Sequence, residues 1–230
     1  RSLTFSPGDE ILIVDHGYNA CNNAARFVEK KCGAKVVSAP FPFPLQSDEQ
    51  VVESLLAHIN PGKTQLLLVD HITSPTGIVL PVEKIVAAFA ERGIDTLVDG
   101  AHAPGMVPLD LDKLGAAYYT GNCHKWLCTP KGTAFLHVRK DKQQRNDDEP
   151  LIRPLSISHG ANAKIGKHKR FRLEFDWTGT TDPTPWLCIP ASIRFLSDLF
   201  PNGLTGLREH NRAMALAART YLTNLFGTQL

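Results

Sequence analysis

Short apolar runs that alternate with longer amphipathic segments constrain the fold of this chain more than any other feature. Three such runs, each followed by a polar loop, are Glu10–Val14, Gln65–Val69 and Thr96–Asp99. Segments with helical periodicity lie between them. This alternation predicts an α/β domain with a mostly parallel central sheet and helices on both faces, a three-layer α/β/α sandwich.

Local signals predict where several elements begin and end. Gly33 is a stop signal for an Ala-rich helix that follows the first run. Ser47 with Gln50 forms a capping box that opens the next helix. We also expect strands at 34–39, 117–120 and 133–138, a strand-like segment at 151–160, a mobile polar loop at 141–150, and helices at 191–199 and 203–226.

The composition is that of an ordinary globular chain. Its 230 residues are 43% hydrophobic and 21% charged, with a formal net charge of +2, and they suffice for one sizeable core. Near-neutral charge favours neither nucleic acid nor an anionic membrane as a partner. No run approaches the roughly 18 apolar residues of a membrane span. We interpret the basic cluster Lys164–Arg172 as a solvated loop or the rim of a cleft.

The cysteines form an odd-numbered set without paired spacing: Cys21, Cys32, Cys123, Cys128 and Cys188. This pattern predicts free thiols in a reducing compartment, and therefore a cytoplasmic location. Cys123, His124 and Cys128 could suggest zinc, but no second Cys/His pair completes a tetrahedral site, so we expect no metal. The first residues lack the apolar core of a signal peptide.

Lys125 lies in the stretch with the clearest chemistry. It stands between His124 and Trp126, after the strand-like segment 117–120 and before the apolar run 133–138. This context predicts a lysine that is held at the end of a strand and partly removed from water. Such an amine loses its proton more readily than one in bulk solvent, and the free amine can form a Schiff base with an aldehyde.

Asp99 is the second residue of this kind, because it ends an apolar run and is followed at once by Gly100. In open α/β sheets, side chains at the carboxyl ends of strands project toward the ligand. A carboxylate there can keep a pyridinium nitrogen protonated, which makes a pyridoxal ring an electron sink. Lys125 and Asp99 are the minimal set for this chemistry, so we predict pyridoxal 5′-phosphate (PLP) as the cofactor.

Two motifs in this order resemble a known family. Val98-Asp-Gly-Ala-His-Ala-Pro-Gly105 and Asn122-Cys-His-Lys-Trp-Leu-Cys-Thr-Pro-Lys-Gly132 resemble the class V aminotransferases among fold-type I PLP enzymes. The His-Lys-Trp-Leu form and the later Thr178-Gly-Thr-Thr-Asp-Pro183 are most similar to the isopenicillin N epimerase-like and cysteine desulfhydrase-like branch, with cysteine desulfurases more distant. The resemblance extends over nearly the whole chain and implies a PLP-dependent transferase-like large domain.

The resemblance implies which residues surround the cofactor ring. Lys125 would hold PLP as an internal aldimine, and Asp99 would contact the ring nitrogen. A side chain from the first polar loop, either His16 or Tyr18, would stack on the ring. His102 would approach the phenolic oxygen of the cofactor.

Further implied contacts involve the third polar loop. Thr73 or Ser74 would touch the ring or the substrate, although Ser-Pro and Thr-Gly are also ordinary turn residues. We expect Trp126 to pack beneath the site rather than touch substrate.

Phosphate binding is implied for Asn122 and His124. Thr180, with Thr181 as the alternative, would reach the phosphate of PLP in a partner subunit, which implies a homodimer. The other interpretation of this segment is a glycine-threonine turn that caps the following helix.

These residues together predict an enzyme that acts on an amino acid. Lys125 would remove the α-proton while Asp99 stabilises the carbanion through the protonated ring. The motifs favour an epimerase-like or cysteine desulfhydrase/desulfurase-like reaction and do not exclude transamination. The alternative is a truncated or non-catalytic PLP-fold protein that acts as a dimerising partner. A Rossmann-like nucleotide binder is disfavoured, because no glycine-rich loop follows the first strand.

We expect a large PLP-binding domain over residues 1–200, with its N-terminal part missing. A long helix over residues 201–230 would lead to a C-terminal small domain that is absent. The resemblance implies a phosphate-binding loop before this chain and, after it, an arginine for the substrate carboxylate. If these residues were the whole polypeptide, we would expect weak turnover or none.

Overall fold

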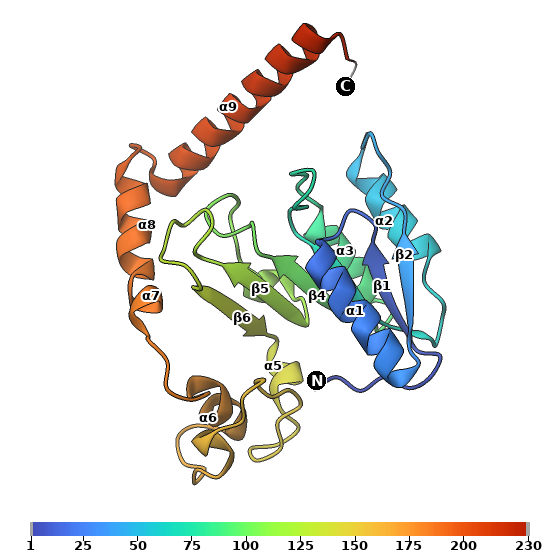
Figure 1. Cartoon of the computed structure of the whole chain (residues 1–230), viewed down its shortest axis with the longest axis vertical. Helices are drawn as coiled ribbons and strands as arrows, with labels where there is room; N and C mark the ends of the chain where they lie inside the picture. The colour runs from blue at the N-terminus through green and yellow to red at the C-terminus, as the bar shows by residue number, and fades with distance from the viewer. Residues whose placement is uncertain (1, 229–230) are drawn as a thin grey trace.

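The computed structural model describes residues 2–228 and contains a mixed sheet flanked by helices (Figure 1). The strands lie in the order β2-β1-β3-β4-β5-β6. Neighbouring strands are parallel except β6, which runs antiparallel to β5. Their bounds are Glu10–Val14 (β1), Lys35–Ala39 (β2), Thr64–Asp70 (β3), Asp95–Gly100 (β4), Tyr118–Asn122 (β5) and Ala134–Val138 (β6). The predicted α/β fold with a mostly parallel sheet is confirmed.

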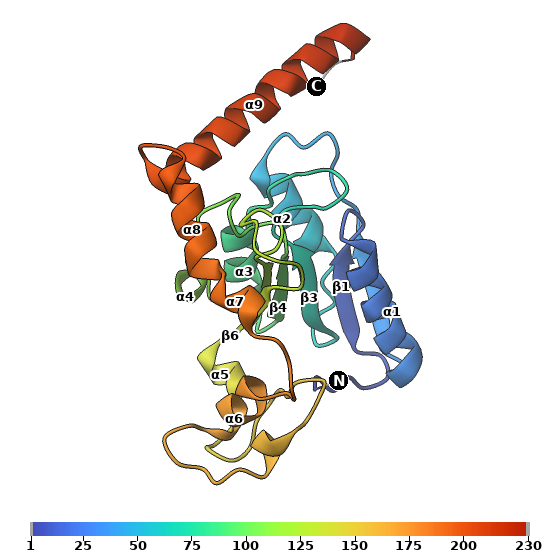
Figure 2. The ribbon, with the colours of Figure 1, turned by 60° about the vertical axis from the view of Figure 1, so that its left-hand side comes forward.

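Helices cover both faces of this sheet, as the sandwich prediction requires. Ile11 and Ile13 of β1 pack toward α1 (Asn19–Cys32), whereas Leu12 and Val14 pack on the opposite side. That side is covered by α2 (Asp48–Ala57) and α3 (Val82–Ala90). Figures 1 and 2 show the helices on opposite faces. The period-2 alternation of a strand explains this division.

The direction in which strands are added reverses at β1. After β1 the chain adds β2 on one side, and it then returns to add β3 on the other. The loops that leave β1 and β3 therefore diverge at the carboxyl edge of the sheet. In open α/β sheets this switch point is the usual place of a ligand crevice.

The predicted helix ends depend on local backbone chemistry and are confirmed. Gly33 follows α1 with φ of 77°, the left-handed conformation that glycine adopts without steric cost, and its N–H bonds Glu29 O. Ser47 caps α2 and accepts the N–H of Gln50 at 3.4 Å.

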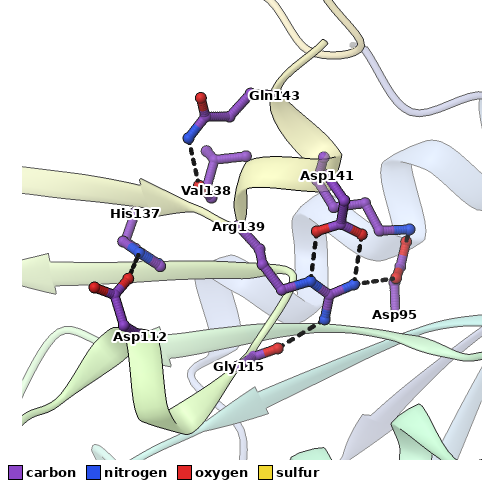
Figure 3. Close-up of polar contacts among 9 residues, drawn as sticks. Asp95, Asp112, Gly115, His137, Val138, Arg139, Asp141 and Gln143 are labelled. Atoms are coloured by element: carbon purple, nitrogen blue, oxygen red, sulfur yellow. Dashed lines mark hydrogen bonds and ion pairs between the residues drawn. The ribbon is translucent and has the colours of Figure 1, made fainter. Parts of the chain in front are cut away.

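A polar network fastens the end of β6 at the sheet edge opposite the candidate site (Figure 3). Arg139 donates to both carboxylate oxygens of Asp141, at 2.6 and 2.9 Å, and to Gly115 O at 2.7 Å. Lys142, in α5 (Lys140–Gln143), pairs with Asp95 at the start of β4 at 2.6 Å. Because β6 is antiparallel, this anchoring leaves its other end at the carboxyl edge of the parallel strands.

Two predictions about the segment after β6 are wrong. Residues 151–160 form no strand; the segment is irregular and leads into a short 3-10 helix, η1 (His159–Ala161). Pro154 has no N–H for a ladder bond, and Ile152 is buried in a small cluster with Phe171 instead. The polar segment 141–150 is not wholly a loop, because α5 extends into it.

The basic cluster is only partly solvated, which corrects our interpretation of it. Arg170 is buried at the start of α6 (Arg170–Asp176) and donates to Gly160 O and Ala163 O. It also pairs with Asp148 at 2.8 Å. A buried guanidinium requires such partners, since its charge is otherwise costly to desolvate.

The last helices leave the sheet. They are α7 (Thr184–Leu187), α8 (Ile189–Asp198) and α9 (Gly203–Phe226), and a four-residue helix, α4 (Leu111–Leu114), lies earlier between β4 and β5. The predicted bounds of α9 are confirmed. It projects away from the sheet (Figures 1 and 2), and none of its described residues is buried. Across residues 2–228, every helix is too short or too polar to cross a bilayer.

Candidate active site

Polar side chains from several loops converge at the carboxyl edge of the parallel strands. Asp99 lies near the end of β4 and is 8% exposed. Lys125 lies in the turn that follows β5 and is partly buried. The prediction of a lysine held at a strand end is therefore confirmed.

Lys125 is joined to the loop after β4 through His102. Lys125 Nζ lies 3.1 Å from His102 Nε2. On the other side of the same ring, Trp126 Nε1 donates to His102 Nδ1 at 3.2 Å. Burial, and then the charge of Lys125, lower the pKa of His102 below its ordinary value, which keeps the imidazole neutral at physiological pH.

Trp126 does not pack beneath the site as expected. Its side chain is 49% exposed, and its indole binds His102. Residues 123–127 form turns, and Cys128 has a left-handed backbone with φ of 57°. The sequence offers no signal for this arrangement, because a lone tryptophan is usually a packing residue.

Asp99 has two hydrogen-bond donors of its own. The backbone N–H of Ala101 donates to Oδ1 at 2.9 Å, and the thiol of Cys21 donates to Oδ2 at 3.1 Å. Burial, followed by the bond to Asp99, raises the pKa of Cys21 to about 12. Cys21 is thus a neutral thiol that donates to Asp99.

Asp70 lies beside Asp99 in the strand register. It is buried at the end of β3 and accepts the backbone N–H of Tyr18 at 3.2 Å. Burial, and then the nearby charge of Asp99, raise the pKa of Asp70 to about 6. The sequence analysis missed Asp70 and Cys21. Asp70 could have been found, because like Asp99 it stands at the end of a buried apolar run. Nothing in the sequence around Cys21 indicates a role at the site.

The two aromatic candidates of the first loop lie in different surroundings. The ring of His16 stacks on Phe41 with 4.6 Å between centroids, and Nδ1 lies 3.4 Å from Thr76 Oγ1. Tyr18 is the residue that directly precedes α1, where its side chain makes no capping hydrogen bond and is exposed. The loop from which both come is at the site edge, bound to it through the contact of Tyr18 with Asp70.

Thr73 is buried and its hydroxyl takes part in a turn. Oγ1 accepts the N–H of Ile78 at 2.8 Å and lies 2.7 Å from Thr76 Oγ1. Ser74 is exposed one residue further on, where its backbone N–H bonds Asp70. The loop after β3 therefore lies beside the carboxylates, with its turn chemistry formed as the residue types suggest.

The candidate phosphate-binding residues are spread over a wider region. Asn122 ends β5, and His124 Nδ1 lies 2.9 Å from the carbonyl of Thr133. Since a carbonyl only accepts, His124 carries a proton on Nδ1. Thr180 and Thr181 are exposed in the loop between α6 and α7.

Within residues 2–228 there is no group of three or more His, Cys, Asp or Glu side chains that could hold a metal ion. What the edge brings together is an amine, two carboxylates and a neutral imidazole. Such a set can hold an electron-withdrawing organic cofactor and move a proton near it.

Comparison with known proteins agrees with this interpretation. The family model described as aminotransferase class-V matches residues 1–230. The chain is 33% identical to a putative L-cysteine desulfhydrase 1 of Oryza sativa subsp. japonica, over 98% of this chain and 46% of that protein. It is 34% identical to an isopenicillin N epimerase of Amycolatopsis lactamdurans, over 96% of this chain and 56% of that protein.

Solved structures show the same fold. The cystine C-S lyase C-DES, in complex with cysteine persulfide, superimposes with a TM-score of 0.69 at 27% identity, over 84% of this chain and 51% of that one. A C-DES variant with glycine covalently linked to its PLP cofactor gives a TM-score of 0.68 at 26% identity, over 84% and 50%. This chain spans about half the length of the relatives it matches.

Proposed function

The chain belongs to the class V aminotransferase family, and on that premise we propose that it is the PLP-binding part of an enzyme acting on an amino acid, in a cysteine desulfhydrase-like or epimerase-like reaction. Membership confirms the resemblance and PLP as the cofactor. The observation that carries the proposal is the contact of Lys125 with His102, at the strand edge where Asp99 is buried.

The donor set of this edge fits PLP. A carboxylate offers about four acceptor positions, and Asp99 uses two of them, for Ala101 and Cys21. Acceptor capacity therefore remains for the N–H of a pyridinium ring. Lys125 supplies a primary amine for the aldehyde, and among the described residues this amine contacts the neutral imidazole of His102.

The proposed mechanism uses the groups of this chain as follows. When bound, PLP withdraws electrons from the α-carbon of the substrate. Lys125 Nζ takes the α-proton, with the neutral ring of His102 beside it. Asp99 would accept the N–H of the ring nitrogen and balance its charge, and its burial would keep water from competing for that contact.

The remaining assignments are proposals supported by position. We assign ring stacking to His16 or Tyr18, and a contact with ring or substrate to Thr73 or Ser74, because both loops lie at the site edge. Asn122 and His124 are proposed to bind the phosphate, with the side-chain amide of Asn122 as a hydrogen-bond donor.

Three assignments extend beyond the site itself. We propose that Thr180, exposed between α6 and α7, reaches the phosphate of a partner subunit in a homodimer. We also propose that residues 1–200 form the PLP-binding domain and that 201–230 lead into another domain. A cytoplasmic location stays a proposal; all five cysteines are free thiols.

Cofactor binding is the direct test, because it does not depend on turnover. The purified chain is mixed with PLP, its visible absorbance is recorded, and borohydride is added before peptide mass spectrometry. We expect a borohydride-fixed adduct on Lys125 in the wild type and none at that position in Lys125→Ala. Lys131→Ala, which removes an exposed lysine of the same loop, is the matched control and should keep the adduct.

Two outcomes of this experiment would contradict parts of the proposal. An adduct spread over surface lysines and unchanged in Lys125→Ala would refute the assignment of the cofactor lysine. No adduct at all would favour the alternative of a non-catalytic dimerising partner. Where the adduct forms, a second assay separates the two reactions. Desulfhydration releases sulfide and pyruvate from L-cysteine. Epimerisation instead exchanges the α-hydrogen of the substrate with deuterated water and inverts the α-carbon.

A further inference from the structure

We propose that Asp70 is a positioning residue, whose carboxylate ties together the loops that follow β1 and β3 and so holds both of them beside Asp99. This tie is a property of the chain alone. Its use, which is to keep the cofactor-facing side chains of the two loops in place, rests on the proposed function.

The carboxylate of Asp70 bonds the backbone of both loops. Its two oxygens accept the N–H of Tyr18, from the loop after β1, at 3.2 and 3.4 Å. The N–H of Ser74, in the loop after β3, bonds it as well. These loops carry the candidates for ring stacking and for contact with ring or substrate. Asp70 therefore reaches those candidates through their backbone.

A second contact joins the same two loops at the surface. Thr76 Oγ1, in the loop after β3, lies 3.4 Å from His16 Nδ1, in the loop after β1. This contact is long and exposed, so water competes with it. Asp70 is only 4% exposed, and its bonds are made by a carboxylate, which accepts more strongly than a neutral group. The buried carboxylate is thus the stronger of the two links.

The start of α1 is attached to two neighbouring strand ends. Asp70, at the end of β3, bonds Tyr18, which directly precedes the helix. Asp99, its register partner on β4, accepts the thiol of Cys21 from the first turn of the helix at 3.1 Å. The place of the first loop relative to Asp99 therefore depends on the bond that Asp70 makes.

Asp70 occupies this position at a cost in stability. It is buried beside the buried carboxylate of Asp99, and both burial and that neighbour disfavour its ionised form. An asparagine would avoid the charge, but it has one acceptor oxygen instead of two and accepts less strongly. A group that lowers stability while it bonds two loops at the ligand edge of an open sheet is typical of a functional site.

Amide hydrogen exchange tests the tie without cofactor. The 15N-labelled chain is transferred to deuterated buffer at pH 7, and the exchange of each backbone N–H is followed by NMR. In Asp70→Ala, which removes both acceptor oxygens, Tyr18 and Ser74 should exchange roughly tenfold to hundredfold faster, the factor that a hydrogen bond to a charged group represents. Asp70→Asn should accelerate at least one of the two, because a single oxygen remains.

Glu29→Gln is the matched control. The carboxylate of Glu29 also accepts a backbone N–H, that of Val36 at 2.9 Å, but it lies near the other end of α1. Exchange at Tyr18 and Ser74 should be unchanged in this variant. Exchange as slow as in wild type at both positions, in a folded Asp70→Ala variant or in Asp70→Asn, would overturn the proposal. Asp70→Asn decides the question if Asp70→Ala does not fold.

The affinity for PLP separates positioning from a purely structural role. The Kd is measured by absorbance during titration with PLP at pH 8. We expect Asp70→Asn to bind PLP about tenfold more weakly than wild type, because only chains with both loops in place bind it, although the same substitution removes a buried charge that costs stability. Glu29→Gln should bind as wild type does.

The outcomes distinguish this proposal from the proposed function. Equal Kd values for wild type and Asp70→Asn would overturn the positioning role, since the tie would then not serve the cofactor. A wild-type chain that binds no PLP would instead refute the proposed function. The exchange data would still decide in that case whether Asp70 ties the two loops.

Discussion

Replacing Asp70 by asparagine should stabilise the chain at high pH and leave it nearly unchanged at low pH. Asp70 is buried at the end of β3, beside Asp99 in the register. Burial and the charge of Asp99 raise its pKa from 3.8 to about 6. The ionised carboxylate is therefore less favourable in the folded chain than in the unfolded one.

The size of the effect follows from the two pKa values. The pKa of Asp70 is about 6 in the folded chain and 3.8 in the unfolded chain, a difference of about 2.2. This difference corresponds to about 3 kcal/mol at 1.36 kcal/mol for each pKa unit. Below pH 3.8 the carboxyl of Asp70 is protonated in both the folded and the unfolded chain, so the free energy of unfolding is not reduced by its ionisation. As the pH rises through about 6 the folded chain binds more protons than the unfolded one, so the free energy of unfolding falls by that amount.

An amide cannot ionise, so Asp70→Asn avoids this loss. Its single side-chain oxygen can still accept the N–H of Tyr18 or of Ser74, although less strongly than a carboxylate does. We therefore expect a net gain of about 2 kcal/mol at pH 8, or roughly 4–8 °C in melting temperature for a chain of this size. At pH 4 the two proteins should unfold within about 0.5 kcal/mol of each other.

Urea unfolding at pH 4 and pH 8, followed by circular dichroism, measures the difference. Glu53→Gln is the control, since it makes a similar change on the exposed face of α2 and should alter neither curve. If Asp70→Asn is no more stable than wild type at pH 8, then the ionised carboxylate carries no penalty. The reasoning from burial and from Asp99 would then be refuted.

Two further predictions use matched positions within the chain. Gly105 and Gly8 share a φ of 91°, so replacing either by alanine should cost about 1–2 kcal/mol of folding free energy. Only at Gly105 does the new Cβ also meet Trp126 O, at 2.6 Å, so Gly105→Ala should have the lower melting temperature of the two variants. Equal melting temperatures would contradict this steric explanation. Burial raises the pKa of Cys21 to about 12, so at pH 8 iodoacetamide should alkylate it about 1000-fold more slowly than a cysteine of pKa 9.0. Peptide mass spectrometry measures this against the exposed Cys128, and comparable rates at the two thiols would rule out a protected Cys21.

The sequence predicted those parts of the fold whose signals lie within one element. β1 was identifiable because residues 11–14 are buried between two helix layers, which requires a continuous apolar run. The end of α1 was identifiable because Gly33 alone meets its backbone requirement. Lys125 and Asp99 could be placed together since parallel strands share a carboxyl edge.

Elements that depend on a distant partner were not predictable in this way. Residues 151–160 have the apolar residues of a strand, but a strand also needs a neighbour with free backbone groups. Here Ile152 fills a cluster with Phe171, and Pro154 could not join a ladder. Composition cannot distinguish a buried irregular segment from a strand of this length.

The site shows the same limit at the level of single side chains. The thiol of Cys21 reaches Asp99 from α1, and the indole of Trp126 reaches His102 across two loops. Neither contact leaves a mark in the spacing of the residues concerned. Each exists because the tertiary fold brings separate loops to one edge, and the donor or acceptor that a side chain finds there decides its role.

The reversal at β1 also determines when this sheet can be completed during synthesis. β1 is synthesised before both of its neighbours, β2 and β3. Ile13 can therefore pair with Ser38 on one side and with Leu68 on the other only after those residues have been synthesised. At roughly 5–20 residues per second, the second partner leaves the ribosome about 3–11 s after Ile13. For that interval the apolar residues 11–14 of β1 have at least one open edge, the arrangement that pairs most readily with other chains. The strand at which the order of addition reverses is thus the one that a nascent chain must protect for longest.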